Sequence, residues 1–302
     1  MAPAIYEQIA SALLRHLDAG PEVEPRLGAA LRQLAVHPGK LMRAALAYET
    51  ARRAGVGRRN AERLACAVEY FHVASLVLDD LPCMDDAAMR RGMPCVHRQH
   101  GEATAILAAL ALINRAYALM GEALAGQPRR VREEAWSCLT RALGTAGLVG
   151  GQAWDLAFAG TDRSARTVSR IAAAKTAALF SLAIMVPGLL LRPTRAERRA
   201  LRALGVYWGQ LVQIADDFVD VMAPGFEVGK TTGRDGRLVR PNLVLALGLP
   251  RARARLDRLT GQAARVLAQL EQRGKGRWRQ FREAGETLTQ VCAVREPARS
   301  AA

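Results

Sequence analysis

Apolar residues recur along this chain with the period of an α-helix. Between residues 5 and 17 they stand four positions apart, and the pattern ends at Gly20-Pro21, which predicts an amphipathic first helix. Similar spacing predicts helices after Lys40 and over residues 60–78, 103–124, 131–143, 164–187, 194–221, 251–272 and 277–292. No segment alternates apolar and polar residues as strands do, so we expect an all-α protein without a sheet, folded as a single domain over residues 1–302.

Local signals refine this pattern at three places. Asn60 is positioned to cap the long apolar helix that follows it, and Thr194 with Glu197 three residues later fits a capping box. Residues 223–241 are rich in glycine and proline and contain Lys230 and several arginines. A loop of this length within a helical chain predicts a functional segment, and its charge predicts contact with an anion.

The composition agrees with a helical core and excludes several protein classes. Half of the 302 residues are hydrophobic but only 5% are aromatic, so the core must rest on aliphatic side chains. The unbroken apolar runs are too short to span a membrane, and the N-terminus lacks the pattern of a secretion signal. The five cysteines form no CxxC pair, which indicates free thiols and a cytoplasmic location.

The formal net charge of +15 admits three kinds of partner, namely nucleic acid, an anionic membrane or an anionic small molecule. Seven of the twelve aspartates nevertheless lie in two clusters, at 79–86 and 216–220, and only four lysines are present. The arginines are dispersed and no aromatic residues interleave with them, so the sequence argues against nucleic-acid binding. Some of the charge is compatible with weak association with a membrane surface.

The second cluster lies on a predicted helix with apolar flanks. Asp216 and Asp220 share one face of that helix, with Asp217 beside them. Like charges at this spacing destabilise a helix unless a cation compensates them. Oxygen ligands without histidine or cysteine favour a hard ion such as Mg²⁺, and the alternative is a salt-bridged cluster facing arginines.

The first cluster follows an apolar helix directly. Asp79 and Asp80 come first, and Pro82 bends the chain so that Asp85 can turn back toward them. Arg90-Arg91-Gly92 comes next. Two acidic clusters and a double arginine predict a metal-bridged polyphosphate site, because Mg²⁺ combines few carboxylates with phosphate oxygens and arginine binds phosphate through two N–H groups.

These motifs, in this order, resemble those of the trans-isoprenyl diphosphate synthases. The resemblance covers most of the chain and is carried by residues 39–43 (GKLMR), His72, 79–85 (DDLPCMD), 90–92 (RRG), 150–156 (GGQAWDL), 175–176 (KT), Gln213, 216–220 (DDFVD) and 229–235 (GKTTGRD). The family joins an allylic diphosphate to isopentenyl diphosphate head to tail. It implies the isoprenoid synthase fold, a bundle of about ten or more helices around a central elongated cavity.

The resemblance also implies a role for each matching residue. The metal site would use about three Mg²⁺ ions, with Asp79, Asp85 and Asp216 as ligands and Asp80, Asp217 and Asp220 as ligands or supports. Arg90, Lys175 and Lys230 would bind the allylic diphosphate, and Lys40, Arg43, His72 and Arg91 the isopentenyl diphosphate. Thr176 and Gln213 would direct oxygen dipoles at the allylic cation. A homodimer, with an interface near the first motif, is implied as well.

The chain departs from the family pattern in its late loop. This loop is shorter by two or three residues, and Arg234 and Arg237 stand near two of the expected lysines. Asp155, in the GGQAWDL segment, is interpreted as a helix cap or a salt-bridge residue.

Three residues on the helix before the first motif predict the product length. Ser75 and Ala74 are small and lie one turn before Asp79, where an aromatic side chain would block elongation, and Phe71 one turn deeper is the candidate floor. This favours a C20 product, geranylgeranyl diphosphate, over C15 farnesyl diphosphate. A non-catalytic subunit of a heteromeric synthase and a class I terpene cyclase are the alternative functions. The intact acidic motifs argue against the former, and Lys40, Arg43 and His72 against the latter.

Overall fold

The computed structural model describes residues 3–222 and 233–292, and most of these residues are helical. The first half contains α1 (Pro3–His16), α2 (Pro25–Val36), α3 (Met42–Arg53), α4 (Arg58–Asp79), α5 (Val96–His100), α6 (Glu102–Leu124) and α7 (Arg129–Leu143). The second half contains α8 (Leu148–Leu156), the 3₁₀ turn η1 (Phe158–Gly160), α9 (Ala165–Leu190), α10 (Arg195–Met222), α12 (Arg234–Leu238), α13 (Leu243–Leu247), α14 (Leu249–Gly274) and α15 (Arg279–Val291). The predicted all-α class is confirmed.

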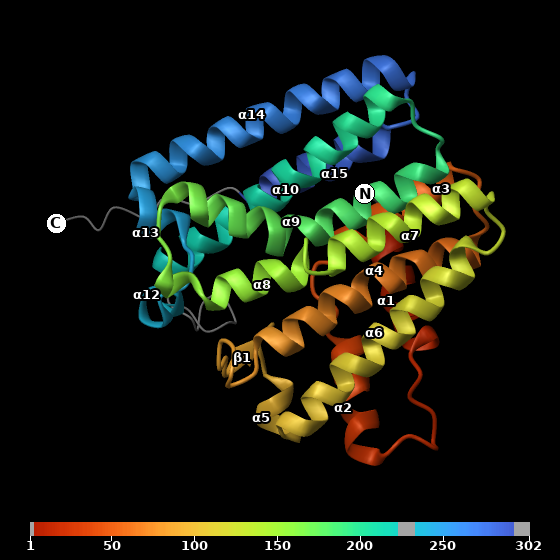
Figure 1. Cartoon of the computed structure of the whole chain (residues 1–302). Helices are drawn as coiled ribbons and strands as arrows, with labels where there is room; N and C mark the ends of the chain where they lie inside the picture. Colours follow the sequence, from red (N-terminus) through yellow and green to blue (C-terminus); the bar gives the residue numbers. More distant parts are fainter. Residues whose placement is uncertain (1–2, 223–232, 293–302) are drawn as a thin grey trace.

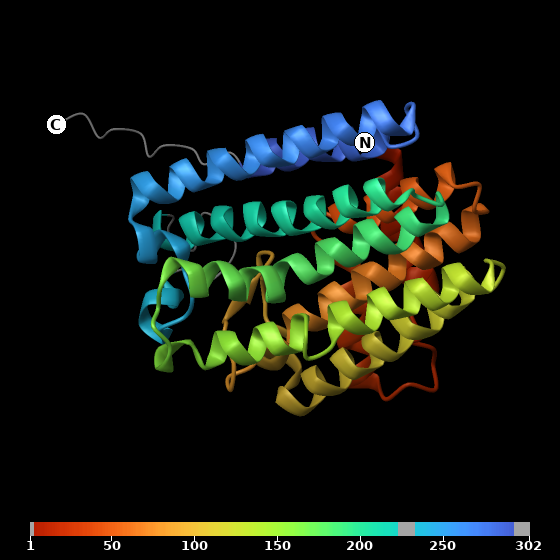
Figure 2. The same ribbon diagram turned by 45° about the horizontal axis from the view of Figure 1, so that its top comes forward.

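The long helices pack side by side. Helix α9 packs against α10, which in turn packs against α14 (Figure 2). A hydrophobic core, which we call the second core, lies among these helices. On the other side of the bundle α4 packs closely against α6 and α3, around a first core rich in alanine and leucine (Figure 1). Alanines on these helices let their backbones approach, which explains how so few aromatic residues can fill the interior.

Several predicted helix boundaries change in the structure. The capping box before α10 is confirmed, because the Thr194 N–H donates to Glu197 Oε2 at 2.8 Å and the Glu197 N–H to Thr194 Oγ1 at 3.3 Å. The predicted cap at Asn60 is wrong, since α4 begins one turn earlier and Gly57 is its N-cap residue. Helix α9 continues three residues beyond Pro187.

Several elements were not expected from the sequence. They include α2, α5, α8, α13 and a short hairpin, and also α12, which lies within the segment predicted as a loop. Helix α2 starts at Pro25 behind the Glu24 cap, whose carboxylate accepts a hydrogen bond from the Leu27 N–H at 2.8 Å. A hairpin of two-residue strands, β1 (Met89–Arg90) and β2 (Met93–Pro94), contradicts the expectation of no strand. Strands this short are invisible to an alternation test, which needs several residues.

Among residues 3–222 and 233–292, two helices are long and apolar enough to cross a membrane by length and composition, although the sequence predicts no membrane span. They are α6 and α9. The most apolar window of α9 is 67% buried within the fold, as expected of a core helix, whereas that of α6 is only 39% buried. Helix α6 therefore presents an apolar face that the rest of the described chain leaves uncovered.

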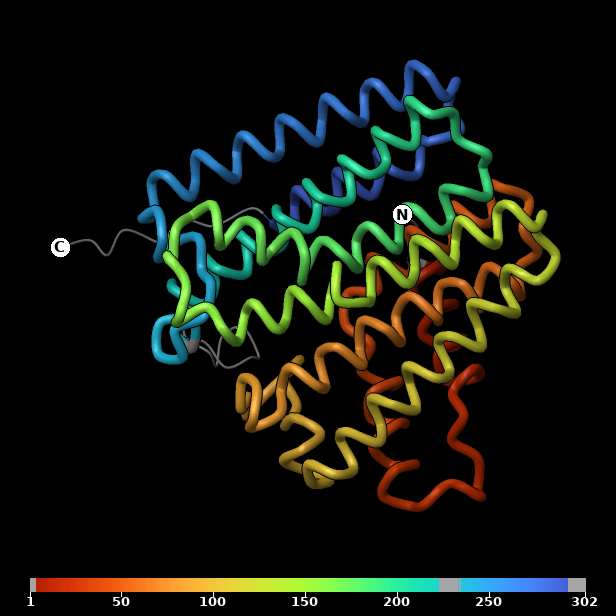
Figure 3. The backbone as a smooth tube through the Cα atoms, viewed as in Figure 1, coloured from red at the N-terminus to blue at the C-terminus, as the bar shows by residue number. Residues whose placement is uncertain are grey.

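The turn that carries the first acidic motif and the segment from α12 to α13 meet at one end of the bundle. The turn after α4 and the segment from α12 to α13 lie near each other there, although they are separated by some 150 positions in the sequence (Figure 3). Arg240 joins them directly, since its Nη2 donates to the Met84 carbonyl at 2.6 Å. This end of the bundle is where the candidate site is found.

Candidate functional site

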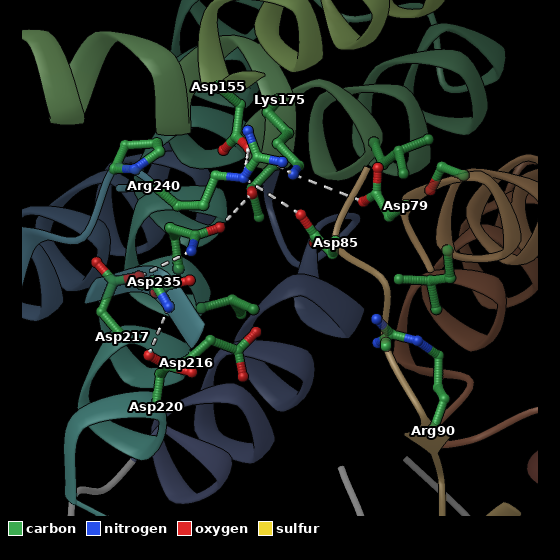
Figure 4. Close-up of a pocket in the computed structure, with 18 of the residues that line it drawn as sticks. Asp79, Asp85, Arg90, Asp155, Lys175, Asp216, Asp217, Asp220, Asp235 and Arg240 are labelled. Carbon is green, nitrogen blue, oxygen red and sulfur yellow. Dashed lines mark hydrogen bonds and ion pairs between the residues drawn. The ribbon is translucent and has the colours of Figure 1, made fainter. Parts of the chain in front are cut away.

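A chamber of about 240 Å³ opens at this end of the bundle. It is enclosed by α4 and the turn after it, by α8, α9 and α10, and by residues 235–241. Charged side chains converge on it from all these elements (Figure 4), while Leu76, Leu148 and Leu179 form part of its wall. A site that combines an apolar wall with converging charges suits a substrate with a hydrocarbon tail and an ionic head.

The first acidic motif folds back on itself at the end of α4. The Asp85 N–H donates to the Asp79 carbonyl at 2.9 Å, and the Asp86 N–H donates to the Leu81 carbonyl at 2.9 Å. This turn places the carboxylates of Asp79 and Asp85 on the chamber, as expected from Pro82. Burial raises the pKa of Asp79 to about 6, against the opposing effect of Lys175.

Asp80 points elsewhere. It is buried and does not line the chamber, because the Arg90 guanidinium binds both of its oxygens, with Nε 2.8 and 2.7 Å from Oδ1 and Oδ2 and Nη2 2.6 Å from Oδ1. Arg90 itself lines the chamber. Of the two predicted roles, this geometry supports a positioning role for Asp80 rather than direct metal ligation.

The second acidic motif lines the chamber with all three of its carboxylates, Asp216, Asp217 and Asp220. Asp216 and Asp220 lie one turn apart on α10. Asp217 is 1% exposed and is held by the protein, since it accepts hydrogen bonds from Gln213 Nε2 at 2.8 Å and from the Leu243 N–H at 2.7 Å. Burial raises the pKa of Asp217 to about 8.

A hydrogen-bonded chain extends from Asp217 across to α9. Thr176 Oγ1 donates to Gln213 Oε1 at 2.5 Å, so the Gln213 amide has its oxygen toward Thr176 and its nitrogen toward Asp217. Thr176 and Gln213 both line the chamber. The structure thus brings together two side chains that are 37 positions apart and fixes the direction of their dipoles.

Lys175 occupies the centre of the site. Its Nζ lies 3.6 Å from Asp79 Oδ2 and 3.5 Å from Asp155 Oδ2. Burial alone would lower the pKa of Lys175, but Asp79, Asp155 and Asp85 outweigh it and raise the pKa, so the ammonium stays charged. Helix α8 can pack closely against α9 here because residue 151 is glycine. A Cβ at that position would stand 2.3 Å from the backbone nitrogen of Lys175.

Asp155 and Arg240 complete the network. Asp155 is a salt-bridge residue, which is one of the two roles predicted from the sequence. It contacts both Lys175 and Arg240. Arg240 Nε lies 3.4 Å from Asp85 Oδ1 and 3.9 Å from Asp155 Oδ2. The sequence had placed the loop's cations at Arg234 and Arg237, and it missed Arg240. Lys230 lies outside the described residues.

Asp235 was also missed as a site residue, although the sequence flagged its segment. It lines the chamber beside Asp220, whose Oδ2 accepts from the Asp235 N–H at 3.2 Å. Burial raises the pKa of Asp235 to about 6, against a hydrogen bond from Asn242.

Two of the four residues expected to bind isopentenyl diphosphate lie together on the chamber. Arg43 and His72 line the chamber, and Arg43 Nη1 is 3.3 Å from His72 Nε2. Burial, reinforced by Arg43, Arg91 and Arg90, lowers the pKa of His72 well below its ordinary value, so its imidazole is neutral. Arg91 lines a smaller neighbouring cavity, and Lys40 is exposed and lines neither of the two.

The three chain-length candidates occupy different environments. Ser75 lines the chamber one turn below Asp79, whereas Ala74 is fully buried in the first core and does not line it. Phe71 is buried below Ser75, and its ring packs edge-on against Tyr117 of α6 at a centroid distance of 5.0 Å. Ser75 is therefore the candidate best placed to touch a growing chain.

The donor set fits Mg²⁺ shared with a phosphate ligand. Among residues 3–222 and 233–292, no three carboxylate, imidazole or thiol side chains lie close enough together to hold an ion alone. The chamber instead carries separate carboxylates on two sides, and the buried Asp85 Oδ1 accepts no hydrogen bond within the described chain. Mg²⁺ commonly takes one or two carboxylates and completes its shell with phosphate and water.

Comparisons with known proteins point in one direction. A family model described as polyprenyl synthetase matches residues 24–273. The chain is 38% identical to a geranylgeranyl diphosphate synthase of Pantoea ananas over 251 residues, covering 82% of this chain and 81% of that one. It is 37% identical to a chloroplastic geranylgeranyl pyrophosphate synthase of Arabidopsis thaliana, over 79% of this chain and 68% of that one.

A solved structure agrees with these sequence matches. A geranyltransferase from Helicobacter pylori, complexed with magnesium and isoprenyl diphosphate, superposes with a TM-score of 0.82. The sequence identity is 27%, over 96% of this chain and 98% of that one.

Proposed function

Since this chain belongs to the polyprenyl synthetase family, we propose that it is a prenyl diphosphate synthase whose product is the C20 compound geranylgeranyl diphosphate. The short-chain prenyltransferase activity follows from the family and from relatives that are themselves geranylgeranyl diphosphate synthases. The observation that carries the proposal is the chamber, in which Asp79 and Asp85 lie across from Asp216 and Asp220 beside a charged Lys175. Its substrates would be isopentenyl diphosphate and allylic diphosphates.

Mg²⁺ is the cofactor proposed for this site, in about three ions that the allylic diphosphate would bridge. Asp79, Asp85, Asp216 and Asp220 would hold them, because their carboxylates line the chamber. When bound, the metal would stabilise the negative charge that develops on the departing diphosphate. The magnesium in the Helicobacter pylori geranyltransferase supports this choice of ion.

The chain's own cations would then orient the allylic substrate. Lys175 stays charged between two carboxylates, and Arg90 is fixed by Asp80, so both can bind the diphosphate without reorganising. Lys230 is assigned the same role from the family motif. Thr176 and Gln213 would direct oxygen dipoles toward the allylic cation, while the departed diphosphate removes the proton after carbon–carbon bond formation. No protein base is required.

Isopentenyl diphosphate would bind on the opposite side of the chamber. Lys40, Arg43, His72 and Arg91 are the proposed contacts. Arg43 and His72 already line the chamber within 3.3 Å of each other, and the neutral His72 can donate one N–H to a phosphate oxygen.

The product length rests on the wall of the chamber below Asp79. Ser75 leaves room for the growing chain, and the Phe71–Tyr117 ring pair lies one turn deeper as the proposed floor. This arrangement favours C20 over C15. The names of several relatives, which are geranylgeranyl diphosphate synthases, support the same length.

We also propose a homodimer that pairs through α6. The exposed apolar side chains of this helix recur at helical spacing, with exposures of 41% for Ile106, 53% for Leu107, 54% for Leu110 and 37% for Tyr117. They form a stripe on the helix whose apolar window is least covered. A second copy of the chain would bury this stripe. Contiguous exposed apolar surface of this kind generally marks a protein–protein interface.

The expected location is the cytoplasm, where the five free cysteines would stay reduced. Binding to a membrane surface would be at most weak. The deciding experiment incubates the protein with Mg²⁺, isopentenyl diphosphate and each of the C5, C10 and C15 allylic primers, and sizes the dephosphorylated products by chromatography. A C20 alcohol from every primer is expected. A C15 end product would show that the proposed C20 length is wrong. The absence of product with every primer would favour a non-catalytic subunit.

A further inference from the structure

A buried glutamate sits behind the residues proposed to bind isopentenyl diphosphate. Glu69 lies on α4, one turn before His72, and is 1% exposed. Carboxylates are rarely buried so completely unless a cation pairs with them. Within the part of the chain that the structure describes, Arg91 and Arg43 are the cations that act on Glu69, and Arg91 Nη2 lies 3.8 Å from Glu69 Oε1. Glu69 does not line the chamber, so the substrate-binding roles assigned above leave it without a function.

Arg91 is held from three sides. Its own φ of 54° is in the left-handed region, and its Nη1 donates to the His37 carbonyl at 2.8 Å. Gly39 packs against its guanidinium, since a Cβ at that position would stand 2.7 Å from Arg91 Cζ. Glu69 supplies the remaining contact from inside the protein. The head group of Arg91 is therefore fixed where the GKLMR segment meets α4.

Arg43 is held in a comparable way. Its guanidinium lies 4.0 Å from the centre of the Phe180 ring, and its Nη1 is 3.3 Å from His72 Nε2. Three buried polar atoms of this cluster have no hydrogen-bond partner within the described chain, namely Arg43 Nε, Glu69 Oε1 and His72 Nδ1. Buried atoms of this kind normally find partners, so the cluster is incomplete without a further polar group.

The charges of the cluster explain why a carboxylate is needed there. Burial lowers the pKa of Arg43, and the positive charge of Arg91 lowers it further. The two guanidinium groups are therefore close enough to repel each other. A carboxylate beside both offsets that repulsion and keeps the two guanidinium groups convergent. With one glutamate between two arginines, the cluster keeps a net positive charge for an anionic ligand.

We propose that Glu69 is a positioning residue that holds Arg43 and Arg91 in the orientation that receives the diphosphate of isopentenyl diphosphate, without touching that substrate. This inference rests on the proposed function, because it assumes that the second diphosphate binds at Arg43, His72 and Arg91. Glu69 acts through the two arginines, so its contribution appears in the binding of one substrate only.

Steady-state kinetics of Glu69→Gln test the inference. The substitution keeps the shape and removes the charge, so at pH 8 KM for isopentenyl diphosphate should rise about tenfold, the loss expected for one charge-assisted contact. The value of kcat and KM for the allylic primer should stay within twofold. Glu69→Asp, which keeps the charge on a shorter side chain, should fall between wild type and Glu69→Gln.

Glu62→Gln is the matched control. Glu62 lies on the same helix, is also buried, and also binds arginines, with Arg58 Nε at 3.0 Å and Arg15 Nη2 at 3.2 Å from its carboxylate. It lies away from the chamber, so its loss should affect stability and leave both KM values unchanged. If Glu69→Gln leaves KM for isopentenyl diphosphate unchanged, or raises both KM values together, the inference is overturned.

A double-mutant cycle tests whether Glu69 acts through Arg91. In the Arg91→Ala background, Glu69→Gln should raise KM for isopentenyl diphosphate by clearly less than it does in wild type. Two effects that simply multiply would refute the positioning role. If wild-type protein fails to consume isopentenyl diphosphate with any primer, the proposed function fails instead, and calorimetric binding of isopentenyl diphosphate alone then tests Glu69 separately, with a tenfold weaker dissociation constant expected for Glu69→Gln.

Discussion

Replacing Ser75 with phenylalanine should shorten the product. Ser75 lines the chamber one turn below Asp79, and its Oγ donates to the His72 carbonyl at 2.8 Å, so its side chain has a defined place on the wall. A benzyl group at this position would occupy the space between the diphosphate end of the chamber and the Phe71–Tyr117 ring pair. The growing chain would meet this ring before it reaches the floor.

The size of the effect follows from the apolar surface that each added unit buries. At about 0.8 kcal/mol per buried methylene, a five-carbon unit gains up to about 4 kcal/mol inside the protein. Excluding the last unit would remove this gain, which corresponds to roughly a thousandfold preference for release over further extension. The main product of Ser75→Phe should therefore shift from C20 to C15 or C10.

Ala74→Phe is the informative comparison, since the sequence alone gives both positions the same role. Ala74 is fully buried in the first core, so a phenylalanine there should overpack it at a cost of about 1–3 kcal/mol in the free energy of unfolding. Thermal unfolding should show the loss, and chromatography of the dephosphorylated alcohols should show an unchanged length. If Ala74→Phe shortens the product while Ser75→Phe does not, the chain grows along a different face of α4 and the reasoning fails.

Two further predictions address the metal site and the assembly. Asp216→Ala should lower turnover by orders of magnitude with the helical circular dichroism unchanged, and wild-type protein should lose activity in EDTA and regain it with Mg²⁺; full activity in EDTA would contradict the metal-dependent mechanism. Light scattering at micromolar concentration should give the mass of a dimer for wild type, and Leu107→Glu with Leu110→Glu should give a monomer, because both side chains are more than half exposed on α6. A monomeric, fully active wild type would refute the dimer.

The sequence predicts best where a signal is local. The capping box of Thr194 and Glu197 is confirmed because all its hydrogen bonds lie within four residues. The spacing of Asp216 and Asp220 places both on the chamber, since one helical turn fixes their common face. Pro25 behind the capping Glu24 was a readable signal for α2 as well, because proline is favoured in the first turn of a helix.

Long-range packing decides what the sequence missed. Helix α8 contains Gly150 and Gly151, which disfavour helix, yet it forms because the missing side chain of Gly151 allows contact with the backbone of Lys175. Arg240 reaches Asp85 across 155 positions in the sequence, and no motif spacing within the shortened loop distinguishes it from Arg237.

Glu69 combines a local signal in the sequence with long-range contacts that the sequence does not reveal. A glutamate on the apolar face of α4 was visible in the sequence as an exception to the pattern. Its partners were not visible, since the left-handed turn of Arg91 that brings the guanidinium back to α4 is a tertiary feature.

The pH dependence of substrate binding offers an independent view of Glu69. Burial raises the pKa of Glu69 to about 7, although Arg91 and Arg43 oppose the shift. His72 faces the same cluster but stays neutral, because burial and the nearby arginines lower its pKa well below the ordinary value. Above pH 7 Glu69 is charged and can orient both arginines, whereas below pH 7 it takes up a proton and resembles glutamine.

KM for isopentenyl diphosphate should therefore rise as the pH falls from 8 to 6. Protonation of the substrate acts in the same direction, so the decisive quantity is the ratio of KM in Glu69→Gln to KM in wild type, which should fall toward one at low pH. A ratio that stays constant across this range would mean that Glu69 does not titrate in the working protein.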